Sequence, residues 1–88
     1  MERSLAELRR QVDSIDTQLL DLLNQRGCLV RLIGEAKEEL AMKGRDQTRE
    51  TRILQKIQSV NHGPYRTKDL QELFQKIFLM SLDLQQEK

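Results

Sequence analysis

The chain has 88 residues, of which 33% are charged and only 3% aromatic, and its formal net charge is +1. A chain of this size forms one domain whose core is marginal on its own. Positive and negative side chains are interspersed, so no basic stripe indicates binding to nucleic acid or to a membrane surface.

The sequence also lacks the features of secreted and membrane proteins. The single cysteine, Cys28, cannot form an internal disulfide, which fits a reducing compartment. We find neither a signal-peptide pattern nor an apolar run long enough to span a bilayer. We therefore expect a cytoplasmic protein.

The first half of the chain is predicted to form one long helix, over about residues 4–41. Ser4 and Glu7 have the spacing of a capping box, which starts a helix. Apolar residues then recur at steps of three or four, the period of one helical face. We call these residues the apolar stripe: Leu5, Leu8, Val12, Ile15, Leu19, Leu22, Leu29, Ile33, Ala36 and Leu40.

The length of this helix predicts a dimer. At 1.5 Å per residue it would be about 55 Å long, whereas a compact chain of this length has a radius of gyration of about 12 Å. The rest of the chain is too short to cover the stripe. A second copy is the simplest cover, so we expect an intertwined helical homodimer.

Two more helices are predicted after a loop at residues 41–45. Asp46 can cap a helix over 46–60, and Gly63 and Pro64 prevent that helix from continuing. Thr67 can cap a third helix, over 67–86, with Asp69 in its first turn. Because no segment alternates with period two, we expect one all-α domain over residues 1–88, with three helices per chain and no strands.

Polar side chains interrupt the apolar face of every predicted helix. Arg26 fills the gap in the apolar stripe between Leu22 and Leu29, and other polar residues extend or flank the three faces. Burying a charge without a partner costs several kcal/mol, so these groups must satisfy one another or a ligand. The remaining residues of this set are Arg9, Lys37, Asp46, Glu50, Ser81 and Gln85.

Helix geometry indicates which of the cations can act together. Arg26 and Lys37 are 11 residues apart, hence about 20° apart around the helix and about 16 Å along it. Both side chains can reach one small molecule between them. Arg9 lies about 25 Å from Arg26 along a straight helix, so it would reach only the pocket of a second, antiparallel copy. The expected ligand of such a cation-rich site is a small dianion.

Simpler interpretations exist for each residue taken alone. Arg26 could fix the register of a dimer, Asp46 could be only a helix cap, and Ser81 could simply allow close packing. Glu50 and Arg49 could be solvated charges, and Gln85 could be exposed at a helix end. The sequence offers no cluster of metal ligands, no glycine-rich phosphate loop and no nucleophile with an evident base. A site that binds a ligand and stabilises charge remains.

Ordered motifs along nearly the whole chain resemble those of the all-helical chorismate mutases. The segments that carry the resemblance are Leu8-Arg9, Ile15-Asp16, Leu22-Leu23-Asn24-Gln25-Arg26, Ile33-Gly34-Glu35-Ala36-Lys37, Arg45-Asp46, Arg49-Glu50, Leu73-Phe74-Gln75, Ser81 and Gln85. The resemblance implies a three-helix chain, dimerised through its long helix, that converts chorismate to prephenate.

The resemblance also implies a role for each site residue. Arg26, and Arg9 from a second copy, would bind the two carboxylates of the substrate. Lys37 and Gln85 would hydrogen-bond the ether oxygen, and Glu50 would hold the ring hydroxyl. Since the reaction is a unimolecular rearrangement, it implies neither a cofactor nor a metal. Supporting contacts would come from Asp46, Arg49 and Ser81.

A second function follows from the connector between the last two helices. The segment Asn61-His62-Gly63-Pro64-Tyr65 looks like that of the mutase domains fused to 3-deoxy-heptulosonate-7-phosphate synthases. Such a domain could instead bind chorismate or prephenate to regulate the attached synthase. A helical dimeriser without a ligand is a third interpretation.

Overall fold

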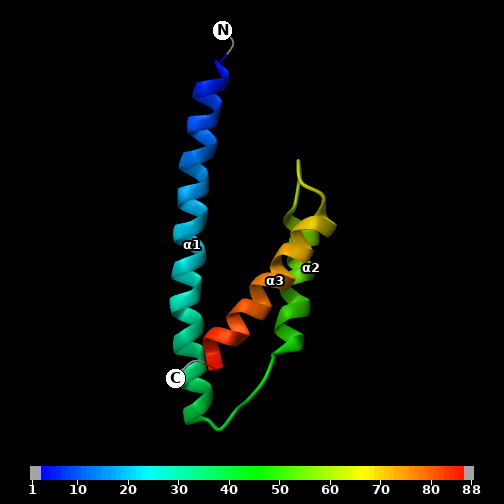
Figure 1. The fold of residues 1–88 in the computed structure, drawn as a ribbon. Helices are drawn as coiled ribbons and strands as arrows, with labels where there is room; N and C mark the ends of the chain where they lie inside the picture. Colours follow the sequence, from blue (N-terminus) through cyan, green and yellow to red (C-terminus); the bar gives the residue numbers. More distant parts are fainter. Residues whose placement is uncertain (1–2, 87–88) are drawn as a thin grey trace.

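The computed structural model describes residues 3–86, which form three helices. These are α1 (Leu5–Glu39), α2 (Gln47–Val60) and α3 (Thr67–Gln86), arranged as in Figure 1. Over the described range there is no strand. The predicted all-α class with three helices is therefore confirmed.

The ends of α1 follow from local chemistry. Ser4 has an extended backbone, and its hydroxyl accepts a hydrogen bond from the N–H of Glu7 at 3.1 Å, which is one of the two bonds of a capping box. The helix ends at Glu39. Leu40 leaves the helical conformation and Ala41 has a φ of 56°, so the chain turns away there.

The two shorter helices begin differently. Asp46 caps α2, because its carboxylate accepts a hydrogen bond from the N–H of Arg49 at 3.0 Å. The predicted cap at Thr67 is wrong. Thr67 is the first residue of α3, and its hydroxyl accepts a hydrogen bond from the side-chain amide of Asn61 at 3.0 Å. That amide also donates to the carbonyl of Tyr65. The two hydrogen bonds stabilise the connector between α2 and α3.

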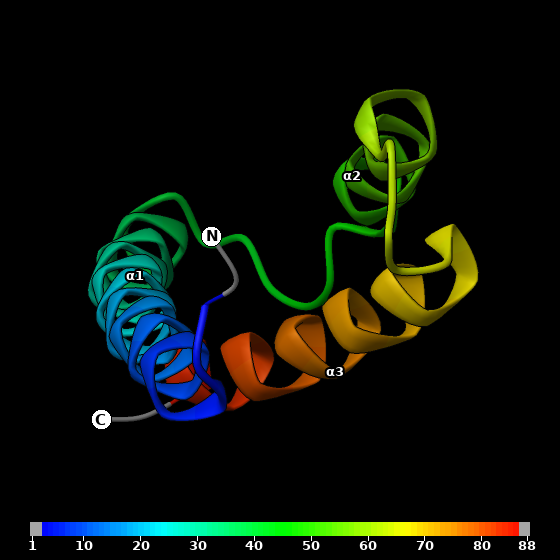
Figure 2. The ribbon, with the colours of Figure 1, turned by 90° about the horizontal axis from the view of Figure 1, so that it is seen from above.

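Helix α3 joins the other two helices. It packs against both α1 and α2. Figure 2 shows α3 running from α1 to α2, which are seen nearly end-on in this view. The buried core is small and lies where α3 crosses α1. Its members are Val30, Gly34, Ile77, Phe78 and Ser81.

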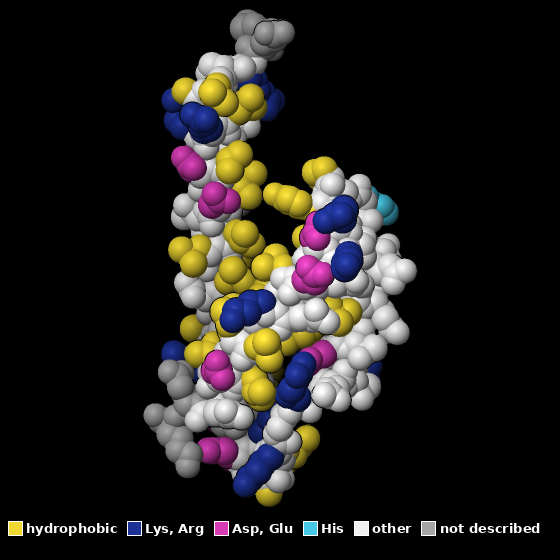
Figure 3. All heavy atoms as spheres, turned by 45° about the vertical axis from the view of Figure 1, so that its right-hand side comes forward, with side chains coloured by type: hydrophobic (Ala, Val, Ile, Leu, Met, Phe, Trp, Pro, Cys, Tyr) yellow, Lys and Arg dark blue, Asp and Glu magenta, His cyan; other side chains and the backbone are white. Residues whose placement is uncertain are grey.

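The single chain is extended and leaves much of α1 uncovered. Its radius of gyration is 16.7 Å and its longest dimension 59 Å, against about 12 Å for the radius of a compact chain of this length. Hydrophobic side chains run along α1 beyond its contact with α3 (Figure 3). In the stripe, Ile15 is 62% and Leu19 52% exposed. Large apolar surfaces of this kind mark interaction sites.

None of the three helices, within residues 3–86, combines the length and the apolar character that crossing a bilayer requires.

Candidate active site

A pocket that opens to solvent lies between the three helices. All three helices and the α1–α2 loop line it. Seven of the eight residues predicted for the site lie here, although they come from segments far apart in the sequence. They are Arg26, Lys37, Asp46, Arg49, Glu50, Ser81 and Gln85.

Two residues of α3 contact the guanidinium of Arg26, which projects from α1. Its Nη1 donates a hydrogen bond to Ser81 Oγ at 2.6 Å, and its guanidinium carbon lies 6.0 Å from the centre of the Phe78 ring, within the range of a cation–π contact. Partial burial, and then the nearby charge of Arg49, lower the pKa of Arg26 from its usual value. Arg26 is therefore a positioned cation whose charge is only partly hydrated.

Lys37 links the other end of the pocket to the loop and to α3. Its Nζ donates to the carbonyl of Gly44 at 2.9 Å and to Gln85 Oε1 at 3.0 Å. The second bond orients the amide, because a glutamine side chain has one oxygen acceptor and one NH₂ donor group. With Oε1 bonded to the lysine, the NH₂ group of Gln85, a residue of the pocket lining, remains available as a donor.

Glu50 is paired with a residue to which the sequence motifs gave no role. Arg45 donates from both Nε and Nη2 to the two carboxylate oxygens of Glu50. This bond, and then the charge of Glu50, raise the pKa of Arg45. Arg45 also lines the pocket. Periodicity could not have revealed this pair, since the two residues are five apart and one of them precedes the helix.

Asp46 and Arg49 lie at the start of α2 and are both exposed. The carboxylate of Asp46 accepts the N–H of Arg49, so the interpretation of Asp46 as a helix cap is correct. Its place in the pocket lining leaves the rest of the carboxylate available to a ligand. The guanidinium of Arg49 faces the same pocket and carries the charge that acts on Arg26.

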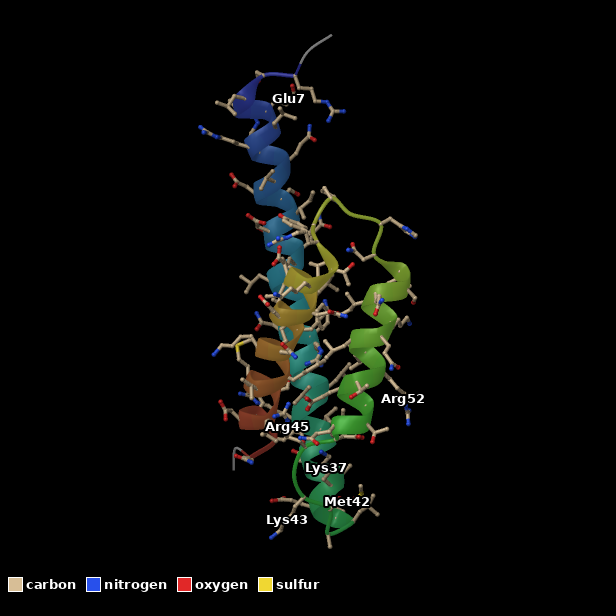
Figure 4. The ribbon with its side chains drawn as sticks, turned by 90° about the vertical axis from the view of Figure 1, so that its right-hand side faces the viewer. Glu7, Lys37, Met42, Lys43, Arg45 and Arg52 are labelled. Carbon is tan, nitrogen blue, oxygen red and sulfur yellow. The ribbon has the colours of Figure 1, made fainter. Side chains whose placement is uncertain are left out.

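Arg9 is the predicted residue that does not join the pocket of its own chain. It lies on the exposed first part of α1, about 25 Å from Arg26 along the helix axis. Figure 4 shows how far apart the two ends are: Glu7 lies at one end of α1, whereas Lys37 and Arg45 lie close to each other at the other end, beside the loop. Arg52, also labelled, points outward from α2.

The charges of the pocket favour an anion. Its lining has four cations and two carboxylates, hence a formal excess of two positive charges. A dianion with an additional hydroxyl or ether oxygen would find partners for each of its groups. Within residues 3–86, no three His, Cys, Asp or Glu side chains gather as they would around a metal ion.

The family model described as "Chorismate mutase type II" matches residues 8–86 of the chain. A chorismate mutase structure from Thermus thermophilus (form II) superposes with a TM-score of 0.91 and 36% sequence identity, covering 96% of each chain.

Curated relatives give the same family name. The chain is 39% identical over 61 residues to a bifunctional chorismate mutase/prephenate dehydratase of Aquifex aeolicus, covering 69% of this chain and 17% of that protein. It is 33% identical over 60 residues to a chorismate mutase of Methanocaldococcus jannaschii, covering 68% of this chain and 61% of that protein. The chain thus spans less than two thirds of the length of either relative.

Proposed function

The chain belongs to the chorismate mutase type II family and is a chorismate mutase domain, and we propose that it catalyses the conversion of chorismate to prephenate. The reaction is a [3,3] rearrangement within one molecule: a C–O bond of the ether bridge breaks as a C–C bond forms. No atom enters or leaves, so the protein needs neither a nucleophile nor a cofactor. Its task is to hold the reactive conformer and to stabilise developing charge.

The observation that carries the proposal is the meeting of Lys37 and Gln85 at one end of a cationic pocket. Negative charge grows on the ether oxygen as the C–O bond breaks. An ammonium group and an amide N–H aimed at that oxygen stabilise the transition state more than the ground state. The 3.0 Å bond from Lys37 to Gln85 Oε1 supports this role, because it leaves Nε2 to donate.

Arg26 supplies the anchor for one substrate carboxylate in this proposal. A guanidinium binds a carboxylate with two parallel hydrogen bonds, which fixes orientation as well as position. Ser81 holds the arginine from behind at 2.6 Å. Glu50 would accept the ring hydroxyl, with Asp46 beside it, and Arg49 would add positive charge at the open side.

We further propose that two copies form an intertwined dimer with shared sites. The uncovered stripe of α1 supports a second copy, because a lone chain leaves residues such as Leu19 and Leu22 more than half exposed. In an antiparallel pair of long helices, Arg9 of one copy would approach the pocket of the other and bind the second carboxylate. The chorismate dianion would then have one arginine for each of its carboxylates.

The larger protein context is also a matter of proposal. The relative from Aquifex aeolicus joins the mutase to prephenate dehydratase, whereas the connector motif suggests 3-deoxy-heptulosonate-7-phosphate synthase as the fused or associated domain. Regulation of such a synthase by bound chorismate or prephenate would use the same pocket. We retain the cytoplasm as the expected location.

The activity is tested by following the loss of chorismate absorbance with the purified chain and identifying prephenate by nuclear magnetic resonance. We expect turnover that saturates with substrate, and loss of turnover in Lys37→Ala. Lys56, an exposed lysine on α2 outside the pocket, provides the control Lys56→Ala, which should retain full activity. Tight binding of prephenate with no faster loss of chorismate than in buffer would favour the regulatory function instead.

A further inference from the structure

Gly34 of α1 lies in unusually close contact with the last turn of α3. It is one of two buried residues on α1. A Cβ atom at this position would lie 2.8 Å from the carbonyl oxygen of Gln85 and 2.9 Å from its Cα. Both are backbone atoms, which cannot rotate out of the way as the tip of a side chain can. An alanine here would have to push the two helices apart.

The backbone conformation of Gly34 does not itself require glycine. The glycines of the described chain with positive φ are Gly44 and Gly63, both in connectors, whereas Gly34 is helical. In the interior of a helix, glycine is about 1 kcal/mol less favourable than alanine. An alanine at this position would therefore be unfavourable because its Cβ would clash with the backbone of α3, and not because of its own backbone conformation.

The same residue of α3 makes both of the contacts that matter here. The backbone of Gln85 rests on Gly34, and its side-chain oxygen accepts the hydrogen bond from Lys37 Nζ at 3.0 Å. Lys37 is three residues beyond Gly34, about 4.5 Å further along α1. The helix separation at Gly34 thus sets where the amide of Gln85 stands relative to the ammonium group.

We propose that Gly34 is a positioning residue for catalysis: the absence of a side chain lets the end of α3 approach α1 closely enough for Gln85 and Lys37 to act on the same substrate oxygen. The proposal rests on the chorismate mutase activity proposed above. It assigns Gly34 no contact with the substrate. An outward shift of Gln85 by about 1 Å is enough to reduce turnover strongly, because misplacement of that size can cost about 100-fold.

Gly34→Ala tests this proposal, and Gly27→Ala is its matched control. Gly27 is on the same helix two turns earlier, and a Cβ there would meet only Leu84 Cδ1, at 3.3 Å, the end of a flexible side chain. We expect kcat to fall by at least about 10-fold in Gly34→Ala and to stay within about twofold in Gly27→Ala. Equal activity of Gly34→Ala and the unsubstituted protein would overturn the proposal.

The change should appear in kcat more than in KM. Arg26, which anchors the substrate, lies eight residues before Gly34, about 12 Å along α1, and its partner Ser81 lies about one turn before Gln85 on α3. We expect KM to change by less than about threefold. A variant whose loss is mainly in KM would contradict a role through Gln85 and Lys37.

A double-variant cycle separates positioning from stability. In a Gln85→Ala background the backbone clash at residue 34 persists, whereas the amide that it displaces is gone. Gly34→Ala should therefore lower the melting temperature in both backgrounds but reduce kcat only when Gln85 is present. The same fold-loss of kcat in both backgrounds would overturn the proposal.

The outcomes for fold and function can be told apart. If Gly34→Ala is unfolded by circular dichroism, all variants are compared in the same concentration of sucrose, which favours the folded state. A variant that stays unfolded there overturns the proposal, since Gly34 would then serve the fold as a whole. An unsubstituted protein that does not convert chorismate would instead contradict the proposed function, whatever the variants do.

Discussion

Arg26 Nη1 donates a hydrogen bond to Ser81 Oγ over 2.6 Å, and the same hydroxyl donates to the backbone carbonyl of Ile77 at 2.7 Å. The guanidinium is thus held by a neutral partner. Within residues 3–86 no carboxylate forms an ion pair with it. Its charge is partly desolvated, as the lowered pKa of Arg26 reflects. A cation in this situation is available to an anionic ligand.

Arg26→Leu should therefore remove activity without loss of stability. Leucine continues the apolar stripe, and Ser81 keeps its bond to Ile77, so no buried polar group loses its last partner. We expect an unchanged or higher melting temperature. Loss of kcat/KM should be about 100-fold or more, since each charged hydrogen bond contributes about 1.5–3 kcal/mol.

Calorimetry and steady-state kinetics on the two proteins decide this prediction. A clear fall in the melting temperature would mean that Arg26 serves the fold. Full activity would remove Arg26 from the substrate site.

Much of this fold was predictable because its signals are local. The three-to-four-residue steps of the apolar stripe predicted the long helix, and the caps of α1 and α2 were correctly predicted at Ser4 and Asp46. Thr67 was misjudged because its hydroxyl is used by Asn61, six residues earlier, and no periodicity reports such a bond.

The site was predictable only where polar residues interrupt apolar faces. That signal found Arg26, Lys37 and Gln85, which the structure brings to one pocket. It could not find Arg45, which lies outside any helix, because the contact with Glu50 depends on the path of the loop. The closeness of Gly34 to α3 is likewise a property of helix packing, and a glycine in the sequence indicates only a weakened helix.

Arg45 should support activity through Glu50. Replacing it with alanine releases a carboxylate that lines the pocket and removes one of the four cations there, so we expect kcat/KM to fall modestly, by about 3- to 10-fold. Arg66→Ala is the matched control, because Arg66 also makes two hydrogen bonds to a carboxylate, that of Asp69, but outside the pocket.

Steady-state kinetics at low and moderate salt measure the effect. Arg66→Ala should leave kcat/KM unchanged. An equal loss in both variants would indicate that such pairs affect the fold in general, and no loss in Arg45→Ala would show that Glu50 needs no support.

Sharing of sites between two copies predicts complementation. Arg9→Ala and Arg26→Ala should each abolish most activity alone, because each removes one carboxylate anchor from every site. Unfolding the two variants together and refolding them creates mixed dimers in which one site regains both arginines. Random pairing should then restore about a quarter of the full activity.

The control is each variant refolded alone, with its dimeric state measured by sedimentation. Restored activity should depend on refolding, since simple mixing leaves the chains unexchanged. If both variants refold as dimers and the mixture stays inactive, the two arginines do not serve one shared site.

Gln85→Glu should convert a pH-independent contact into a pH-dependent one. At neutral pH the amide Nε2 donates a hydrogen bond, whereas an ionised carboxylate only accepts and would repel negative charge on the ether oxygen. A protonated carboxyl can donate again. The variant should therefore be nearly inactive at pH 7 and gain activity as the pH falls through the pKa of the new carboxyl.

The position of Lys37 determines where that gain occurs. Its ammonium group lies 3.0 Å from Gln85 Oε1, and a cation at this distance favours the charged form of a carboxylate in the same place. The pKa of the new glutamate should thus lie below its reference value of about 4.3, and recovery should be confined to the pH range below that value.

Profiles of kcat/KM against pH test this prediction, with circular dichroism at each pH to establish that the protein is folded. Gln86→Glu, the same substitution one residue later on an exposed position, should remain active at pH 7 and show no gain in acid. The unsubstituted protein should show no gain in acid either, because an amide does not titrate in this range.

If Gln85→Glu were as active at pH 7 as it is below about pH 4.3, residue 85 would donate nothing to the reacting oxygen. A gain centred well above pH 4.3 would mean that Lys37 no longer faces the carboxyl, and that the pair seen at 3.0 Å separates when the amide is replaced.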